Sequence, residues 1–430
     1  MRLNEAISSV LNVTKQETET QASWAWVEAS VWTTPMLTAL VNGVKGGKWF
    51  SLMDKVYATA TLNAAWQQVR KNKGSHGVDG VSIERFAVKE EQYLSELQQA
   101  LKDGSYQPLP VKRVMIPKAG GGERPLGIPA VKDRVVQTAL KMVIEPIFEN
   151  EFVNHSYGFR PLRVCKLALR EVDGCLKAGQ TWVVDADLKS YFDTIPHAQL
   201  MTEVEKLISD GKVLKLIASY LEQDIMDGLN RWTPNAGTPQ GAVISPLLAN
   251  LYLHSLDKLM MQAGYTMVRY ADDFVILCQT QEEAENALEL AREWVKEKGL
   301  TLHPDKTHVG NCMVEGQGFD FLGYRFEAGK RWVRKKSLKA LKDKIRSKTR
   351  SNTQVSMATK SKDLNPMLIN WLNVLNMHIN GHSRILMALS GGVYGVSESN
   401  KARAHLSLDV HRKYIELCLT RTSLSLGFSP

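Results

Sequence analysis

The sequence lacks any run of about 18 apolar residues, and its first residues lack the charged-then-apolar pattern of a secretory signal. Cysteine is scarce, with five residues that are widely separated and odd in number. This excludes a disulfide framework, and the lack of cysteine pairs at metal-ligand spacing excludes a zinc site. We therefore expect a soluble, cytoplasmic protein of a reducing compartment, with no membrane partner.

Acidic residues are also fewer than basic residues, with 45 Asp and Glu against 54 Lys and Arg. The chain has a net charge of +9 and an isoelectric point near 9.1, which favours a polyanionic partner. Basic residues gather in one C-terminal stretch, at Lys335, Lys336, Lys339, Lys342, Lys344, Arg346, Lys348 and Arg350. Such a run is usually one solvated face of a helix. Beside a polymerase site it would instead follow nucleic-acid phosphates, with an affinity that falls as the salt concentration rises.

Three aspartates are presented by strand-prone segments. Asp272 and Asp273 lie between Met267–Tyr270 and Phe274–Leu277, which are both rich in β-branched and aromatic residues. A short turn between two such runs makes a hairpin with its carboxylates at the tip. Asp187 lies in another apolar run earlier in the chain. An Asp-Asp pair taken alone is more often a solvated turn, but the flanking strands favour a functional role.

Three carboxylates on two strands suit a two-metal nucleotidyl transferase. Attack of a 3′-hydroxyl on a triphosphate builds negative charge on the attacking and leaving oxygens, and two divalent ions about 3.5–4 Å apart stabilise both. Mg²⁺ needs few carboxylates, because substrate phosphates and water complete its octahedron. We predict two Mg²⁺ ions, replaceable by Mn²⁺, with Asp187 and Asp272 as bridging ligands and Asp273 adjacent.

A glycine-rich hairpin precedes these strands. The strand-prone segment Val111–Lys118 leads through a glycine cluster to a second arm that carries Arg124. Lys118 and Arg124 are six residues apart, so both can reach one triphosphate. The alternative is an exposed hairpin with ordinary surface charges, and the sequence alone does not choose between the two.

Periodicity and turn residues predict alternating helices and strands in a chain long enough for two or three packed units. The predicted helices lie at 62–71, 133–150, 164–176, 198–220, 245–259 and 281–299. The predicted strands around the aspartates lie at 182–188, 307–314 and 319–326. This order indicates an α+β layer with an antiparallel sheet packed on helices, rather than a doubly wound sheet.

Several ordered blocks of sequence resemble one family. They are Ile116–Lys118, Arg124–Pro129, Ser156–Pro161, Asp185–Asp187, Pro239–Gly241 with Ser245–Leu247, Tyr270–Asp273 and Phe321–Tyr324. Any one block could occur by chance, but their shared order over roughly 62–350 is specific. The chain resembles a group II intron-encoded reverse transcriptase/maturase, within the bacterial retroelement reverse transcriptases.

The resemblance implies a right-hand polymerase with fingers, a palm and a C-terminal helical thumb. It assigns metal binding and catalysis to Asp187, Asp272 and Asp273, and triphosphate binding to Lys118 and Arg124. Three further roles are implied, with Gln240 and Gly241 near the nucleotide and template, Lys306 near the leaving phosphate, and Phe192 under the sugar. The Phe192 ring would exclude a 2′-hydroxyl, although periodicity alone favours simple core packing.

The implied partners are an intron RNA template, a DNA primer or target, and dNTPs, with a homodimer left open. We divide the chain into an N-terminal leader (1–55), fingers and palm (56–330), the start of the thumb or maturase region (331–373) and an atypical tail (374–430). The family pattern ends after Asn373, and suitable codons read in a shifted frame restore an arginine-rich segment. We therefore hypothesise a frameshift that leaves the thumb incomplete and impairs maturase function; a divergent tail is the rival.

Three functions remain open. The first is an RNA-directed DNA polymerase that assists the splicing and mobility of its host intron. The second is an RNA-binding splicing cofactor without polymerase activity, against which the intact aspartates and finger cations argue. The third is a defence-associated or other non-intron bacterial reverse transcriptase with the same chemistry on another template.

Overall fold

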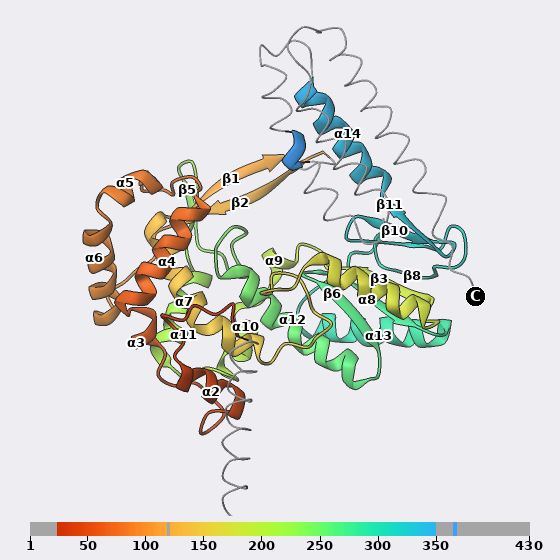
Figure 1. Cartoon of the computed structure of the whole chain (residues 1–430), viewed down its shortest axis with the longest axis horizontal. Coiled ribbons are helices and arrows are strands. Elements are labelled where there is room, and N and C mark those ends of the chain that lie inside the picture. Colours follow the sequence, from red (N-terminus) through yellow and green to blue (C-terminus); the bar gives the residue numbers. More distant parts are fainter. Residues whose placement is uncertain (1–23, 118–120, 350–363, 368–430) are drawn as a thin grey trace, which may run out of the picture. The chain divides into compact units, whose positions relative to one another are not determined.

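The computed structural model describes residues 24–117, 121–349 and 364–367, and these form two compact units (Figure 1). The first unit takes its described residues from 1–163, 187–264 and 290–303, and the second from 164–186, 265–289 and 304–430. Each unit combines helices with a sheet, so the predicted α+β class is confirmed.

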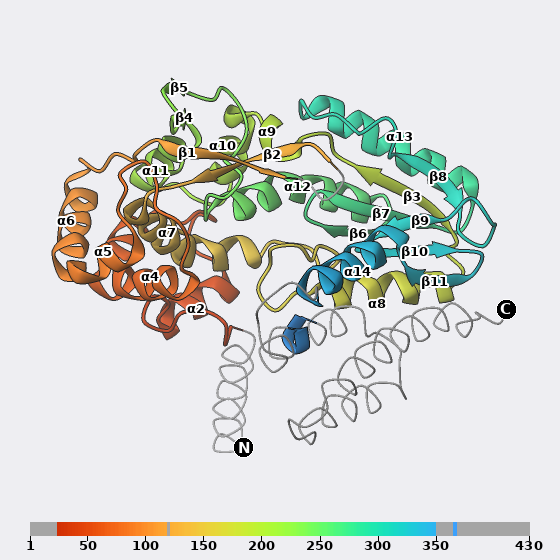
Figure 2. The same cartoon turned by 90° about the horizontal axis from the view of Figure 1, so that it is seen from above.

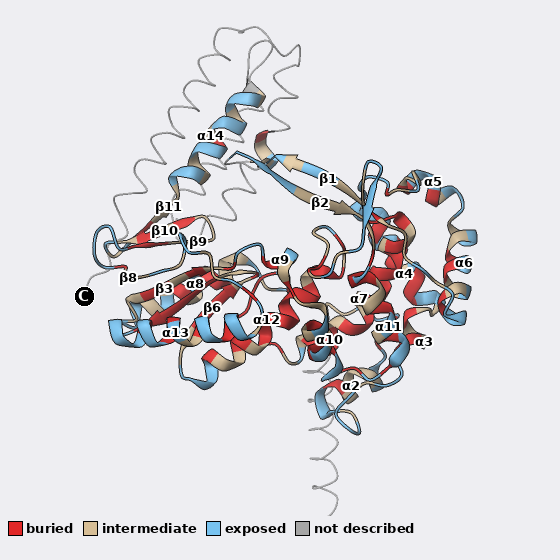
Figure 3. Ribbon diagram, turned by 180° about the vertical axis from the view of Figure 1, so that it is seen from behind, coloured by how far each residue is buried: buried red, intermediate tan, exposed pale blue. Residues whose placement is uncertain are grey.

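The first unit is mainly helical. Its helices are α2 (Thr34–Asn42), α3 (Met53–Val56), α4 (Thr59–Asn72), α5 (Ile83–Val88), α6 (Glu90–Asp103), α7 (Val131–Glu149), α9 (Tyr191–Thr194), α10 (His197–Glu205), α11 (Gly211–Leu221) and α12 (Ser245–Gln262). Helix α7 is central, because α3, α4, α6 and α12 all contact it. Its buried apolar residues recur at helical spacing, including Val136, Leu140, Val143 and Ile147. Figure 3 shows this buried surface along α4, α7 and α12.

The predicted glycine-tipped hairpin is part of the first unit. It consists of β1 (Val111–Pro117) and β2 (Glu123–Ile128), paired antiparallel with Ile116 opposite Arg124. Two short strands, β4 (Ile225–Asp227) and β5 (Asn230–Trp232), complete a sheet of order β2-β1-β4-β5. The hairpin prediction is therefore confirmed as backbone structure, and its tip at 118–120 lies outside the described residues.

The second unit is built on sheets. Its elements are α8 (Cys165–Lys177), β3 (Trp182–Asp187), β6 (Thr266–Tyr270), β7 (Asp273–Cys278), β8 (His308–Asn311), β9 (Phe319–Phe321), β10 (Tyr324–Glu327), β11 (Lys330–Val333) and α14 (Lys335–Thr349). One sheet has the order β6-β7-β3-β8 and the other β11-β10-β9. Helix α8 packs on β6 and β7, as Figure 2 shows. Helix α13 (Gln281–Glu297) has residues in both units, and the last residue of β3, Asp187, belongs to the first unit.

Two predicted elements are each divided in the structure. The segment 319–326 is a hairpin of β9 and β10, because Leu322 and Gly323 both adopt positive φ in a two-residue loop. The segment 198–220 is two helices, because the Asp210 carboxylate accepts hydrogen bonds from the backbone N–H groups of Lys212 and Val213 and so starts α11.

The described part of the predicted leader packs within the first unit. The Trp32 indole is buried and donates a hydrogen bond to the Met142 carbonyl of α7 at 3.0 Å. The backbone N–H groups of Leu52 and Met53 donate to the second carboxylate oxygen of Asp210. The domain boundaries remain predictions, and the tail after Asn373 with its hypothetical frameshift lies outside the described residues.

Candidate active site

The turn that carries Asp272 is short and conformationally demanding. Tyr270 pairs with Asp273 across β6 and β7, so Ala271 and Asp272 form a two-residue loop. Ala271 has a φ of 61°, a left-handed conformation that costs an alanine about 1–2 kcal/mol. The fully buried Arg269 guanidinium donates to the Ala271 carbonyl at 2.9 Å. The hairpin thus holds its tip with a buried hydrogen bond that offsets part of the strain.

Asp187 ends the strand next to this hairpin. Strand β3 is the hydrogen-bonded neighbour of β7, so the strand that ends at Asp187 adjoins the strand that begins at Asp273. The Asp187 side chain is half-buried, and its backbone carbonyl accepts a hydrogen bond from the His303 N–H at 2.7 Å. The two strands predicted to carry carboxylates are therefore adjacent in one sheet.

The donor chemistry suits Mg²⁺, although the described residues do not form a closed metal cage. No group of three or more histidine, cysteine, aspartate or glutamate side chains in the described ranges is arranged to hold a metal ion. Half-buried carboxylates at strand ends are hard oxygen ligands, and Mg²⁺ draws its remaining ligands from phosphates and water. If bound at Asp187, Asp272 and Asp273, the ions would supply charge stabilisation at the attacking and leaving oxygens.

Two of the three predicted cations, Arg124 and Lys306, lie among the described residues. Arg124 is exposed on β2, where a side chain can meet a charged ligand. Lys118 lies outside the described residues. Lys306 is exposed in the turn that precedes β8. Their proposed contacts with a triphosphate remain predictions.

Gln240 and Gly241 lie in a loop that is tightly joined to β2. The Gly127 N–H donates to the Gln240 carbonyl at 2.6 Å. A Cβ on Gly241 would overlap the Gly127 carbonyl oxygen and would approach the Leu126 Cδ1 atom to 2.9 Å. Gly241 also has a φ of +109°, which side chains rarely adopt. This loop therefore depends on a glycine for both space and backbone conformation.

Phe192 is on the short helix α9 rather than in the core. Its side chain is half-buried, and its ring neighbours the Tyr191 and Phe159 rings. The neighbouring Tyr191 is buried, and its hydroxyl donates to the Ala249 carbonyl of α12 at 2.6 Å. The helix is thus anchored by Tyr191, while Phe192 retains an exposed face.

Two contacts of this region were missed by the sequence analysis. The Gln240 side-chain amide donates to both carboxylate oxygens of Asp193, at 3.2 and 3.3 Å. The buried Asp133 accepts hydrogen bonds from the Tyr106 hydroxyl at 2.6 Å and the Leu109 N–H at 3.0 Å. Burial raises the pKa of Asp133 to about 6. Such contacts join residues far apart in sequence. For the contacts of Asp133, the one signal in the sequence is an aspartate within the apolar pattern of a helix.

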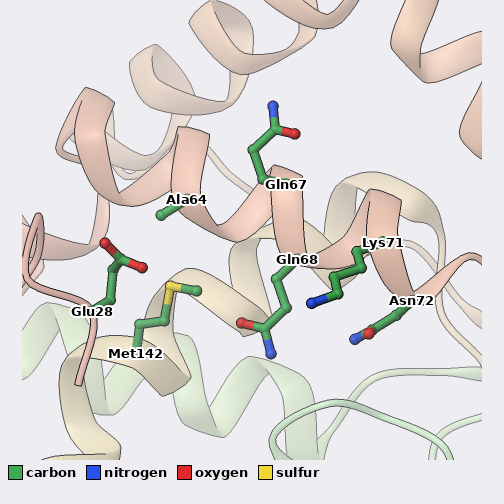
Figure 4. Close-up of a pocket in the computed structure, with 7 residues that line it drawn as sticks. All are labelled: Glu28, Ala64, Gln67, Gln68, Lys71, Asn72 and Met142. Atoms are coloured by element: carbon green, nitrogen blue, oxygen red, sulfur yellow. The ribbon is translucent and has the colours of Figure 1, made fainter. Parts of the chain in front are cut away.

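A surface hollow of the first unit is separate from the predicted site residues. Its lining comes from the turn before α2, from α4 and from α7, with the residues Glu28, Ala64, Gln67, Gln68, Lys71, Asn72 and Met142 (Figure 4). None of these residues belongs to the predicted site. No helix in the described ranges has the length and apolarity to cross a bilayer.

Comparison with known proteins decides the family. The family described as reverse transcriptase (RNA-dependent DNA polymerase) matches residues 116–326. Protein YkfC of Escherichia coli K12 is 37% identical over 296 residues, covering 59% of this chain and 77% of YkfC. The group II intron-encoded protein LtrA of Lactococcus lactis subsp. cremoris is 38% identical over 199 residues, covering 46% of this chain and 33% of LtrA. This chain belongs to the group II intron-encoded reverse transcriptase/maturase family.

The resemblance found in the motifs is thereby confirmed, and the chain carries a reverse transcriptase domain. The match spans most of YkfC but only 33% of LtrA. Among solved structures, a partial Cas6-RT-Cas1–Cas2 complex is 27% identical with a TM-score of 0.37, covering 57% of this chain and 41% of that one. A similarity of this size carries no functional conclusion.

Proposed function

We propose that this chain is the RNA-directed DNA polymerase of a group II intron element. It adds dNTPs to a primer 3′-hydroxyl on an RNA template, with catalysis at Asp187, Asp272 and Asp273. The observation that carries the proposal is the adjacency of β3 and β7, the strands that end and begin at two of these aspartates. Family membership supports the template and the nucleotide class.

The other proposed contacts follow from the same family. Lys118 and Arg124 bind the triphosphate, and Lys306 acts near the leaving phosphate. Gln240 and Gly241 position the nucleotide against the template. The exposed position of Arg124 and the close packing of Gly241 on β2 support two of these roles.

A role in intron RNA binding, splicing and mobility is the second part of the proposal. The name of LtrA supports the intron as the RNA partner. The lysine-rich helix α14 supports an electrostatic contact with RNA, since Lys335, Lys336, Lys339 and Lys344 are all exposed. The maturase function would be weakened if the segment after Asn373 is out of frame.

The test is primer extension by the purified chain on an RNA template, with a DNA primer, dNTPs and Mg²⁺. The double variant Asp272→Ala, Asp273→Ala should lose extension. Asp103→Asn is the matched control, because this aspartate is exposed at the end of α6 and is not among the predicted site residues. Extension that survives in the double variant would refute the assignment. Binding without extension by the wild-type chain would favour a splicing cofactor.

A further inference from the structure

The segment that follows Asp187 is held by a loop from elsewhere in the first unit. The Thr238 N–H donates to the Phe192 carbonyl at 2.6 Å, and the Gly237 N–H donates to the Ile195 carbonyl at 2.8 Å. A Cβ on Gly237 would lie 2.8 Å from the carbonyl carbon and oxygen of Asp193. The loop 237–241 therefore lies directly against the backbone that carries the Phe192 ring.

Gln240 connects this backbone with the β1–β2 hairpin. Its side chain donates to the Asp193 carboxylate, and its own carbonyl accepts the Gly127 N–H of β2. Gln240 thus joins β2 to Asp193, the residue next to Phe192. The carboxylate of Asp193 is exposed, so the fold does not need it for core packing.

The Phe192 ring has a second aromatic neighbour besides the Tyr191 ring, whose centroid lies 5.6 Å away. Phe159 lies edge-on to it, with ring centroids 6.3 Å apart and ring planes at 83°. This geometry is the favourable T-shaped arrangement of aromatic pairs. Phe159 is 49% exposed, which is unusual for a large apolar side chain on a well-packed unit.

The backbone at Phe159 is strained and is fixed by the hydrogen bonds of the next residue. Its φ is 58°, a conformation that a bulky residue adopts at a cost. The next residue, Arg160, is buried and donates to the Glu149 carboxylate at 3.0 and 3.1 Å, and to the carbonyls of Val153 and Ser156 at 2.6 and 2.8 Å. The anchored Arg160 keeps Phe159 against Phe192.

We propose that Phe159 and Asp193 are positioning residues for sugar selection. Phe159 restricts the rotation of the Phe192 ring, and the Asp193–Gln240 contact holds the backbone beneath that ring. Together they keep the ring where it meets the 2′ position of the incoming nucleotide. This inference rests on the proposed polymerase function and on Phe192 as the residue under the sugar.

The test compares kcat/KM for dGTP and for GTP in single-nucleotide addition by the full-length chain. Phe159→Ala should lower the preference for dGTP by about two- to tenfold, the range that corresponds to one aromatic pair. The change should appear mainly as faster use of GTP, because a freed ring admits the 2′-hydroxyl. Phe159→Leu, which preserves bulk, guards against a folding defect and should show a smaller loss in the same direction.

The Asp193 contact is tested separately. Asp193→Ala should lower the preference for dGTP, whereas Asp193→Asn should restore most of it, since the asparagine oxygen still accepts from Gln240. For Phe159→Ala the matched control is Leu162→Ala, because Leu162 lies in the same loop as Phe159, is 73% exposed and also has a positive φ. The control should keep the wild-type preference.

A double-mutant cycle separates positioning from general damage. In a Phe192→Val background, which should itself relax sugar selection, Phe159→Ala should have no further effect on the dGTP preference. The inference is overturned if Phe159→Ala and Asp193→Ala keep the wild-type preference while Phe192→Val relaxes it. It is also overturned if Phe159→Ala acts equally in both backgrounds. A wild-type chain that adds neither nucleotide would overturn the proposed function, and this inference with it.

Discussion

Replacing Gly241 by alanine tests whether the loop at Gln240 must pack directly on β2. The added Cβ would overlap the Gly127 carbonyl oxygen and press on the Leu126 side chain. Both contacts involve β2, the strand of Arg124, so the overlap lies on one side of the loop. The loop must therefore withdraw from β2 or distort.

The expected cost has two parts. A side chain at the Gly241 φ of +109° costs about 1–3 kcal/mol of backbone strain. Withdrawal of the loop also breaks the hydrogen bond from the Gly127 N–H to the Gln240 carbonyl, which contributes about 1 kcal/mol. We expect Gly241→Ala to lower the free energy of unfolding by about 2–4 kcal/mol and to raise the KM for dNTPs.

Chemical unfolding and primer-extension kinetics measure the two effects. Gly104→Ala is the matched control, since Gly104 also has a positive φ, of +74°, but nothing lies within 4 Å of its would-be Cβ. The control should cost only about 1 kcal/mol of backbone strain and leave the KM unchanged. Equal destabilisation in the two variants, with no change in KM for Gly241→Ala, would refute the packing argument.

Three further predictions concern the buried Arg269, the buried Asp133 and the basic helix. Arg269→Met should destabilise the fold by about 1–3 kcal/mol, since the Ala271 carbonyl loses its donor, and should slow extension; unchanged unfolding and extension would contradict this. The pKa of Asp133 is raised from 3.8 to about 6 in the fold, so stability relative to Asp133→Asn should fall by about 3 kcal/mol between about pH 3 and 7, with about 2 kcal/mol of this between pH 4 and 6, and parallel pH profiles would contradict it. Lys339→Gln with Lys344→Gln should reduce the slope of log affinity for RNA against log salt by up to about 2, and an unchanged slope would exclude these lysines from the RNA contact.

The local features of the site could be predicted from sequence because their signals are local. The β-prone runs on both sides of Asp272 and Asp273 predicted the hairpin, and the glycine cluster after Val111–Lys118 predicted the β1–β2 pair. The α+β class followed from the order of these elements. The family followed from short blocks such as Tyr270–Asp273, whose spacing along the chain is visible without any structure.

The remaining features depend on contacts between distant segments. The pairing of Gln240 with Asp193 joins residues 47 positions apart, and no periodicity of either segment predicts it. The fit of Gly241 on Gly127 is equally non-local. The division of 319–326 at Leu322 has a different cause, since the turn requires positive φ at a leucine, which is uncommon.

The central claim is that the carboxylates on the neighbouring strands β3 and β7 hold the catalytic metals, and Mn²⁺ binding tests it most directly. Electron paramagnetic resonance would count the ions bound by the full-length chain with a primer–template and a non-hydrolysable dNTP. We expect two Mn²⁺ ions in the wild type and in Asp103→Asn, and fewer in Asp187→Asn, with nucleotide addition lost in parallel. An Asp187→Asn chain that binds two ions and extends primers at the wild-type rate would contradict the claim.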